Sequence, residues 1–370
     1  MTETLFSSDY HADREAFFAA VGRFTAETGR DVQHHSFAVD ASKDLTVSIA
    51  EFAAERPERV FVISCGIHGI EGYAGSAVMR ALLAKVLPKL DRETTGLVLV
   101  HALNPHGFHH FIRVNRNNVD LNRNCAAKDD GLFASSNPDF AALRTVLGPS
   151  RPVSLSLRDK LKFYLGIGQA LALSGPRALR QATLSGQYLD PAGVFYGGVA
   201  VQPEIAFFQE VFTRIAHTYR EVLVTDMHTG YGVRGNAYPL FGRADSEEFR
   251  EYTESGVRDG STDKAYTVSG DLVGYCWKTA KRLRPDGIFN GVVVEIATHG
   301  LSMRDQLADL HTVVCENQLR HFGAVDGATA DSVQASFREL FDPQQTSWRT
   351  RALEVGVETV QRLLLQRKYV

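Results

Sequence analysis

Four apolar segments rich in β-branched residues place the strongest constraint on the fold of this chain. They are RVFVISCG (59–66), GLVLVHALN (96–104), EVLVTDMHTG (221–230) and GVVVEIATHG (291–300). Strands that stay apolar along their whole length suit a sheet that is covered on both faces. A fifth segment, DLTVSIAEFA (44–53), alternates only in part, which predicts a strand nearer an edge of the sheet.

The segment between the first two strands predicts a helix. Its apolar residues recur at helical spacing: Ala74, Ala77, Val78, Ala81, Leu82 and Val86. A strand, a helix and a second strand in this order indicate an α/β sandwich. The tail from Trp348 to Val370 predicts a further helix. We therefore expect a main domain over residues 1–330 and a helical extension over 331–370 that packs on it.

Polar and glycine residues gather where each of the four strong strands ends. These ends are Cys65-Gly66, Asn104-Pro105, His228-Thr229-Gly230 and Ala297-Thr298-His299-Gly300. Open α/β sheets bind ligands beyond the carboxyl ends of their strands. The sequence therefore predicts a ligand site at this end of the sheet, and we expect the stretch 126–200 to supply helices and loops that line it.

Composition excludes several classes of function. The 370 residues are 44% hydrophobic and 22% charged, with a formal net charge of -3 and without a basic cluster, which argues against binding to nucleic acid. No apolar run approaches the ~18 residues of a membrane span. The first residues lack a signal-peptide pattern, and the four cysteines show no CxxC spacing. We therefore expect a cytoplasmic protein that does not associate with membranes.

The stretch SCGIHGIEGYAG (64–75) places His68 and Glu71 three positions apart among glycines. A catalytic zinc ion usually takes three ligands from His and Asp or Glu and keeps a fourth position open. The glycines permit a tight turn that brings both side chains onto one ion. Because HxxE is a short pattern, the alternative is a plain turn with an exposed glutamate and a partly buried histidine.

His228, at the end of the strand EVLVTDMHTG, is the candidate for the third ligand. A single histidine at a strand end is often structural, but here two candidate ligand groups follow equivalent strand ends. Residues two apart share one face of a strand, so Asp226 lies on the side of His228. A ligating histidine usually donates its second N–H to a carboxylate or a carbonyl, which makes Asp226 a candidate partner.

Glu295 interrupts the otherwise apolar strand GVVVEIATHG. Burial of an ionised carboxylate without a partner is costly, so this side chain needs a catalytic role or a cation. Next to a zinc-bound water, a carboxylate accepts a proton and returns it to a leaving amine. The alternative is a structural ion pair with a buried arginine.

The segment NPHGFHHFIRVNRNNVDLNRNC (104–125) is the most polar part of the chain and carries Arg113, Arg116 and Arg123. An arginine side chain binds carboxylates with two hydrogen bonds and also stabilises a developing oxyanion. A solvated loop is the alternative, but such loops usually contain lysine and glutamate, which this segment lacks.

Taken in order, the motifs GIHGIEG, NPHGF, VDLNRN, DMHTG and VVVEIAT resemble the zinc carboxypeptidase family of carboxypeptidase A, in a bacterial branch. The same order is similar to the related aspartoacylase and succinylglutamate desuccinylase group. The match covers roughly residues 45–300. The resemblance implies an α/β/α sandwich with a mixed, mostly parallel sheet of about eight strands, and one Zn²⁺ per chain at the strand ends.

The resemblance also implies roles for individual residues. The zinc ligands would be His68, Glu71 and His228, and Glu295 would be the catalytic glutamate that activates water. Asn122 and Arg123 match the pair that binds the terminal carboxylate of the substrate. Arg113 is the counterpart of the arginine that polarises the scissile carbonyl, with Arg116 as the alternative. The tyrosine of the family has no single counterpart here: Tyr231, Tyr238 and Tyr275 are all candidates.

These parts together predict a zinc-dependent hydrolase that cleaves a peptide-type amide bond next to a free carboxylate. The alternative is an N-acyl amino acid deacylase with the same metal and base, so the expected partner is a peptide or an N-acyl amino acid. A third interpretation is a non-catalytic descendant that keeps the fold for binding. The presence of all the ligand candidates together with Glu295 and Arg123 argues against it, because a binding protein needs no base.

Overall fold

The fold is built on one mixed β-sheet. The computed structural model describes residues 5–127, 130–247, 249, 251 and 269–370. In these residues the sheet has seven strands in the order β1-β2-β4-β3-β5-β7-β6. Their bounds are β1 Gln33–Asp40, β2 Leu45–Phe52, β3 Arg59–Cys65, β4 Thr95–His101, β5 Glu221–Gly230, β6 Ala237–Ala244 and β7 Ile288–Ala297.

The central strands β4, β3, β5 and β7 are parallel, whereas β2 and β6 run antiparallel to their neighbours. The predicted mixed, mostly parallel sheet is therefore confirmed. The four strong sequence segments form the four central strands, and the segment 44–53 forms β2, next to the edge strand β1. Both sheet edges, β1 and β6, were missing from the sequence prediction.

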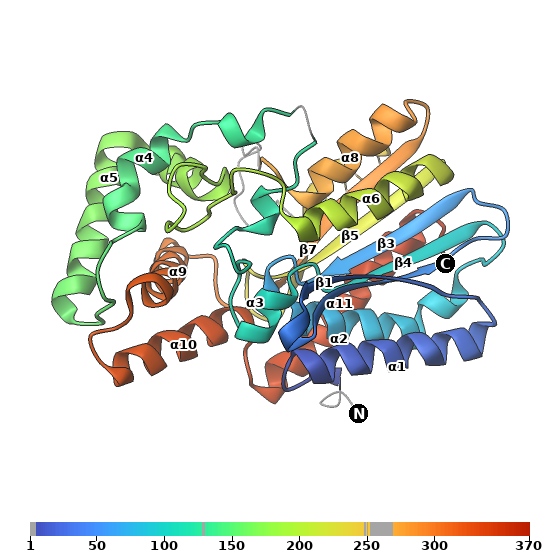
Figure 1. The fold of residues 1–370 in the computed structure, drawn as a ribbon, viewed down its shortest axis with the longest axis horizontal. Helices are drawn as coiled ribbons and strands as arrows, with labels where there is room; N and C mark the ends of the chain where they lie inside the picture. The colour runs from blue at the N-terminus through green and yellow to red at the C-terminus, as the bar shows by residue number, and fades with distance from the viewer. Residues whose placement is uncertain (1–4, 128–129, 248, 250, 252–268) are drawn as a thin grey trace.

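Helices cover both faces of the sheet, as an α/β/α sandwich requires (Figure 1). On one face lie α1 (Tyr10–Thr28), α2 (Gly72–Lys85) and α11 (Thr346–Gln366), and on the other lie α6 (Pro203–Thr218) and α8 (Leu272–Leu283). The predicted helices at 74–86 and in the tail correspond to α2 and α11. The short helix α3 (Pro105–His110) follows β4, where Asn104 caps its first turn by accepting a hydrogen bond from the Gly107 N–H.

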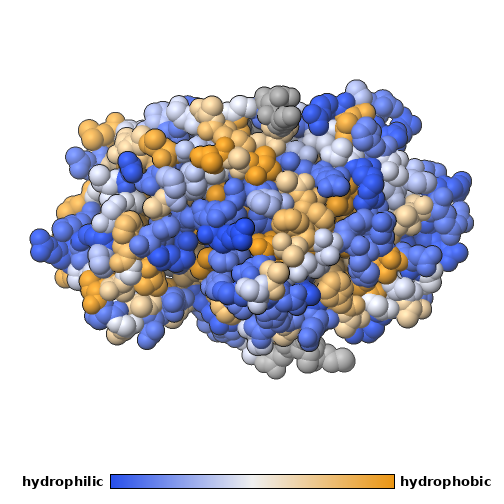
Figure 2. All heavy atoms as spheres, in the orientation of Figure 1, coloured by the Kyte–Doolittle hydropathy of each residue, from blue (hydrophilic) through white to orange (hydrophobic). Residues whose placement is uncertain are grey.

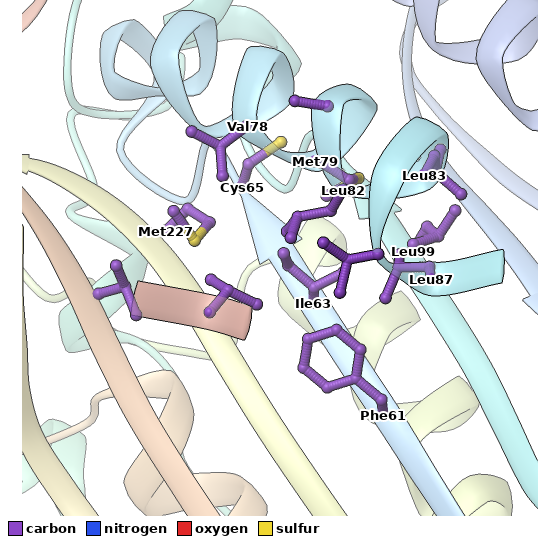
Figure 3. Packing of buried hydrophobic residues seen from close by; sticks show 14 of the residues in the cluster. Phe61, Ile63, Cys65, Val78, Met79, Leu82, Leu83, Leu87, Leu99 and Met227 are labelled. Atoms are coloured by element: carbon purple, nitrogen blue, oxygen red, sulfur yellow. The ribbon is translucent and has the colours of Figure 1, made fainter. Parts of the chain in front are cut away.

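The core on the α2 side shows why the strands are apolar throughout. Phe61 and Ile63 of β3 pack against Leu82 of α2 and Leu99 of β4, and all four side chains are buried (Figure 3). Alternate residues of the same strands, such as Val62, face the second core beneath α6 and α8. Because each of these strands faces an apolar core on both sides of the sheet, its residues do not alternate between polar and apolar.

The helix α11 belongs to the main core. Its Trp348 is buried and donates an Nε1–H hydrogen bond of 3.0 Å to the Ala297 carbonyl at the end of β7. The predicted division of the chain at residue 330 falls within α10 (Gly327–Phe341). The division into a main domain and an extension remains a prediction. All four cysteines of the chain are free and buried.

A helical lobe lies beyond the carboxyl ends of the parallel strands (Figure 1). It contains α4 (Pro138–Leu147), α5 (Leu157–Leu184) and α9 (Met303–Phe322), with α10 beside them. These helices share a small core of their own, which includes Phe140, Phe163 and Val314. Within α5 the helix is kinked at Gly175, whose φ of 76° and ψ of 172° are accessible essentially only to glycine, and Pro176 follows it.

The surface of the molecule is mostly hydrophilic on the face seen in Figure 2, with small groups of hydrophobic residues, one of them over the lobe. Several leucines of α5 are exposed, among them Leu157, Leu165 and Leu173. No helix in the described part of the chain combines the length and the apolar character that crossing a membrane requires.

Candidate active site

The turn after β3 is fixed against the loop that follows β4. Gly69 donates its N–H to the Arg113 carbonyl at 3.1 Å, and Ile70 donates to the Ile112 carbonyl at 3.0 Å. A Cβ atom at Gly69 would lie 2.1 Å from the Gly107 carbonyl carbon, so only glycine permits this approach. The turn that carries His68 and Glu71 is thereby held next to the loop that carries Arg113.

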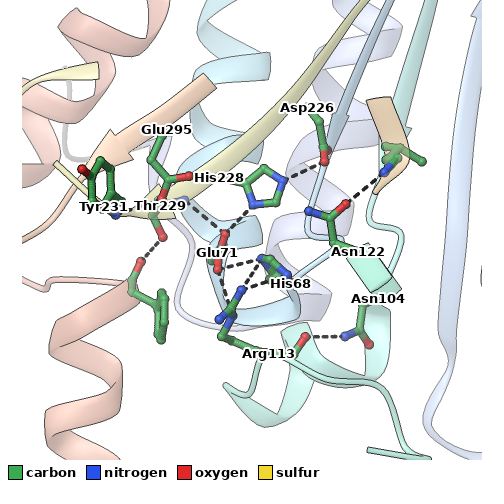
Figure 4. Close-up of polar contacts among 12 residues, drawn as sticks. His68, Glu71, Asn104, Arg113, Asn122, Asp226, His228, Thr229, Tyr231 and Glu295 are labelled. Carbon is green, nitrogen blue, oxygen red and sulfur yellow. Dashed lines mark hydrogen bonds and ion pairs between the residues drawn. The ribbon is translucent and has the colours of Figure 1, made fainter. Parts of the chain in front are cut away.

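Glu71 lies between the two histidines (Figure 4). Its Oε1 is 3.0 Å from His68 Nδ1, and its Oε2 is 3.0 Å from His228 Nδ1. All three side chains are buried, and one potential ligand atom from each lies within 4.8 Å of the other two. The structure thus brings the three predicted ligands together from two separate strand ends.

Each histidine uses its other ring nitrogen to contact a buried aspartate. His228 Nε2 lies 2.7 Å from Asp226 Oδ2, and His68 Nε2 lies 3.1 Å from Asp120 Oδ1. The Ser64 hydroxyl donates to Asp226 Oδ1 at 2.6 Å and holds that carboxylate in place. A tautomer with the proton on Nε2, where each aspartate can accept it, would free both Nδ1 atoms to bind a metal ion.

The contact between Asp226 and His228 agrees with the strand alternation, whereas Asp120 was missed in the sequence. Asp120 lies within the quoted motif VDLNRN, directly before the predicted Asn122 and Arg123. The signal that could have found it is chemical: if Asp226 supports one ligating histidine, the other histidine needs an acidic partner too.

The charges of the cluster compensate one another. Burial by itself would raise the pKa of Glu71, but the charge of His68, hydrogen bonds from both histidines and the charge of Arg113 hold it well below its ordinary value. Burial likewise opposes the ionisation of Asp120, yet His68 and Arg123 lower the pKa of its carboxyl. The pKa of His228 is well above its ordinary value, because Asp226 and Glu71 outweigh the effect of burial.

The donor set fits a zinc ion. Two imidazole Nδ1 atoms and one carboxylate form the His₂Glu set of catalytic zinc sites, which leaves a further coordination position for water or substrate. The rings are oriented by Asp226 and Asp120, as ligating histidines usually are.

Arg113 lies at the edge of the three predicted ligands. Its Nε is 3.3 Å from Glu71 Oε1, and its Nη2 is 2.9 Å from the ring nitrogens of His68. The guanidinium carbon stands 5.1 Å from the centre of the Phe341 ring, a cation–π distance. Asn104 donates its Nδ2–H to the Arg113 carbonyl at 2.9 Å and fixes the backbone there.

Glu295 stands beside His228 because β5 and β7 are parallel and in register at these two residues. Its Oε1 accepts a hydrogen bond of 3.0 Å from the Tyr231 N–H. Burial and the nearby charge of Glu71 raise the pKa of Glu295 to about 7, against the opposing charge of His228. No arginine forms an ion pair with Glu295 within the described part of the chain. Glu295 is therefore a buried carboxylate next to the predicted ligands.

The predicted substrate-binding residues are only partly brought together. Asn122 and Arg123 are largely buried and line a cavity of about 340 Å³ that also includes Arg113 and Glu295. The Asn122 Oδ1 accepts a hydrogen bond from the Leu272 N–H at 3.0 Å, which anchors this side chain by its carbonyl end. Arg116 is exposed and donates to the Val39 carbonyl on β1 at 3.3 Å, so it does not line the cavity.

Of the three candidate tyrosines, Tyr231 lines the cavity. The Tyr238 ring packs against Gly232, and Tyr275 is buried in the core on the α6 and α8 side of the sheet. Tyr231 follows β5 directly, and its N–H already contacts Glu295.

We predict that Asp226→Asn weakens zinc binding about 10- to 100-fold, because the amide no longer accepts the His228 N–H as a carboxylate does. A competitive titration of the metal against a chelator measures the change, and thermal unfolding shows whether the fold is intact. Asp286→Asn, which alters an exposed carboxylate, serves as the matched control. Equal metal affinities of Asp226→Asn and the unaltered protein would contradict the assigned contact.

Comparison with solved structures found matches at low identity, each with a TM-score below 0.5. A candidate metallopeptidase from Shewanella amazonensis is 11% identical, with 89% of this chain and 93% of that chain covered and a TM-score of 0.43. Carboxypeptidase A from Helicoverpa armigera is 12% identical, with 86% and 71% covered and a TM-score of 0.39. Murein-tripeptide amidase from Escherichia coli O157 is 14% identical, with 78% and 95% covered and a TM-score of 0.38.

A search of the curated proteins found no match. A family model does match, and it extends over residues 6–355, which include every residue of the site described above. The chain belongs to the family described as protein of unknown function DUF2817.

Proposed function

We propose that the chain is a zinc-dependent hydrolase that cleaves a peptide-type amide bond next to a free carboxylate. The observation that carries the proposal is the convergence of two Nδ1 atoms and the Glu71 carboxylate, each imidazole being held from behind by an aspartate. Glu295, a carboxylate with a pKa near neutrality, stands next to this set. The three predicted metal ligands by themselves would support only the binding of a metal ion. Together with a carboxylate that can accept a proton, they support hydrolysis.

His68, Glu71 and His228 would hold the zinc ion. When bound, zinc supplies a Lewis acid and lowers the pKa of water to about 7. The same three residues line the cavity, so a metal ion held by them would act on a substrate bound there.

Glu295 is the general base of the proposed reaction. Its carboxylate takes a proton from the attacking water and then delivers it to the nitrogen of the departing amine. The Tyr231 N–H, which donates to Oε1, keeps the carboxylate oriented while the proton moves. Arg113 would stabilise the negative charge that develops on the carbonyl oxygen, since its guanidinium lies at the rim of the same cluster.

Asn122 and Arg123 would bind the free carboxylate of the substrate. Both line the cavity, and a guanidinium next to an amide N–H donor suits a planar anion. Arg123 also donates to the Asn122 carbonyl at 2.8 Å, which restrains the two residues relative to each other. Peptides and N-acyl amino acids both present an amide bond next to a carboxylate, so both belong to the proposed substrate class.

The test combines metal analysis with a substrate screen. Purified protein should contain about one zinc ion per chain, and His68→Ala should remove it. Zinc-loaded protein should hydrolyse at least one member of a panel of dipeptides, longer peptides and N-acyl amino acids, and a chelator should stop the reaction. The exposed His34→Ala serves as the control for loss of an imidazole. Protein that binds no zinc, or turnover that His68→Ala leaves unchanged, would overturn the proposal.

A further inference from the structure

One side of the cavity is formed by apolar side chains of the helical lobe. We call this side the apolar wall, and its members are Leu171 and Leu179 of α5 and Met303, Leu307, Leu310 and Val313 of α9. The residues of α9 recur every three or four positions, so they lie on one face of that helix. Arg180, Thr183, Gln306 and Asp309 also line this part of the cavity.

The apolar wall is the outer layer of the core of the lobe. Leu171, Leu307, Leu310 and Val313 are partly buried and pack against the core that contains Phe140 and Ile167. Met303, at the start of α9, is 46% exposed although it lines the cavity. Apolar surface that is left open to water inside a cavity is a common property of ligand sites.

The kink of α5 shapes this wall. Leu171 precedes the kink at Gly175 and Leu179 follows it, yet both side chains line the same cavity. Pro176 has no N–H to continue the helical hydrogen bonds, so the second half of α5 takes its own direction. The break at Gly175 thus lies between the two leucines of α5 that belong to the apolar wall.

The rest of the cavity is polar and is the proposed reaction site. Asn122 and Arg123 offer hydrogen-bond donors for a carboxylate, and Glu295 stands with the three predicted ligands. A volume of about 340 Å³ lies at the small end of the range of about 300 to 1,000 Å³ that is usual for small-molecule sites. A cavity of this size holds a small amphiphilic molecule or the end of a longer one.

We infer that the substrate joins its free carboxylate to an extended apolar group, and that this group lies against the apolar wall. The inference rests on the proposed function, and it narrows the substrate class to carboxylates with an aliphatic or aromatic group attached through the amide. The wall stabilises the complex by removing apolar surface from water. Each methylene that becomes buried improves affinity roughly fourfold, until the cavity is filled.

The test uses N-acylglycines from acetyl to decanoyl as probes. Their dissociation constants are measured by calorimetry with zinc-loaded Glu295→Gln, in which slow turnover leaves the ligand intact. We expect affinity to rise with chain length by at least 30-fold across the series, which corresponds to a few buried methylenes. The same compounds are then offered to the unaltered enzyme, and release of glycine is measured.

Two residues of α5 give a matched pair of variants. In the same background, Leu171→Gln alters the apolar wall, whereas Leu173→Gln alters a leucine that is 78% exposed and outside the cavity. Met303→Gln provides a second wall variant at an exposed position where the fold tolerates the change. We expect Leu171→Gln and Met303→Gln to flatten the dependence on chain length, and Leu173→Gln to preserve it.

The outcomes separate the inference from the proposed function. If short N-acylglycines are bound and hydrolysed as well as long ones, the inference is wrong while the proposed function stands. If Leu171→Gln and Leu173→Gln weaken the binding of long N-acylglycines equally, the apolar wall is not the binding surface. If no member of the series binds, the inference falls, and the wider peptide screen then decides the proposed function on its own.

Discussion

Glu295→Gln should lower kcat about 10²- to 10⁴-fold and leave zinc binding unchanged. The amide has nearly the same shape as the carboxylate and can still accept the Tyr231 N–H, but it cannot take up a proton from water. Glu295 is not among the predicted ligands, so the metal content should remain at the level of the unaltered protein. Steady-state rates and metal analysis on the same preparation measure both quantities.

The pH profile gives an independent readout for Glu295. The base works in its ionised form, and burial raises its pKa to about 7, so kcat/KM should fall as the pH drops through this region. A cation at the predicted ligands would favour the ionised form and move this acidic limb to lower pH. Glu354→Gln, on the exposed side of α11, should leave kcat/KM and its decrease at acidic pH unchanged. Full activity of Glu295→Gln would refute the assignment of the base.

Asp13→Ala should lower the free energy of unfolding by about 3 to 5 kcal/mol. Asp13 is a fully buried residue in the first turn of α1, and its carboxylate lies 2.7 Å from Arg80 Nη2 and 2.9 Å from His101 Nε2. Removal of the carboxylate leaves the guanidinium buried without its acidic partner, which costs more than the pair itself contributes. Urea unfolding followed by circular dichroism gives the change, provided that the transition is two-state.

Asp286→Ala, at an exposed carboxylate, should change stability by less than about 0.5 kcal/mol and serves as the control. A loss below about 1 kcal/mol in Asp13→Ala would show that Arg80 finds water or another acceptor when the carboxylate is absent. Arg80 already donates to the Leu5 carbonyl, so this outcome has a definite structural origin.

Part of the fold was predictable because burial on both faces leaves a clear pattern in a strand. The central strands β3, β4, β5 and β7 are apolar throughout, and all four were identified from that pattern. The edge strand β1 has one fully buried residue, Val39, so its composition resembles that of a loop. The kink at Gly175 depends on a backbone angle, and neither Gly nor Pro alone indicates where the two halves of α5 point.

In the candidate site, too, contacts between strand ends were easier to predict than contacts made by loops. His228 and Glu295 are neighbours because two adjacent parallel strands are in register; the sequence predicted both strands, and the structure supplies their order and register. The contact between Asp120 and His68 depends on the path of the loop after α3, which no periodic pattern specifies. For the same reason Arg116 stayed an alternative to Arg113 in the sequence, although of the two only Arg113 lines the cavity.

The hydrogen bonds of Thr229 connect the predicted ligands to a distant part of the chain. Its N–H donates to Glu71 Oε2 at 3.2 Å, and its hydroxyl donates to the Phe341 carbonyl at the end of α10 at 2.6 Å. Leu340 and Phe341 also line the cavity, and the Phe341 ring lies under Arg113. The last helices therefore furnish part of the enclosure in which the substrate would be held. Truncation of the chain before α10 would open that enclosure to solvent and would also remove α11 from the core beneath the sheet.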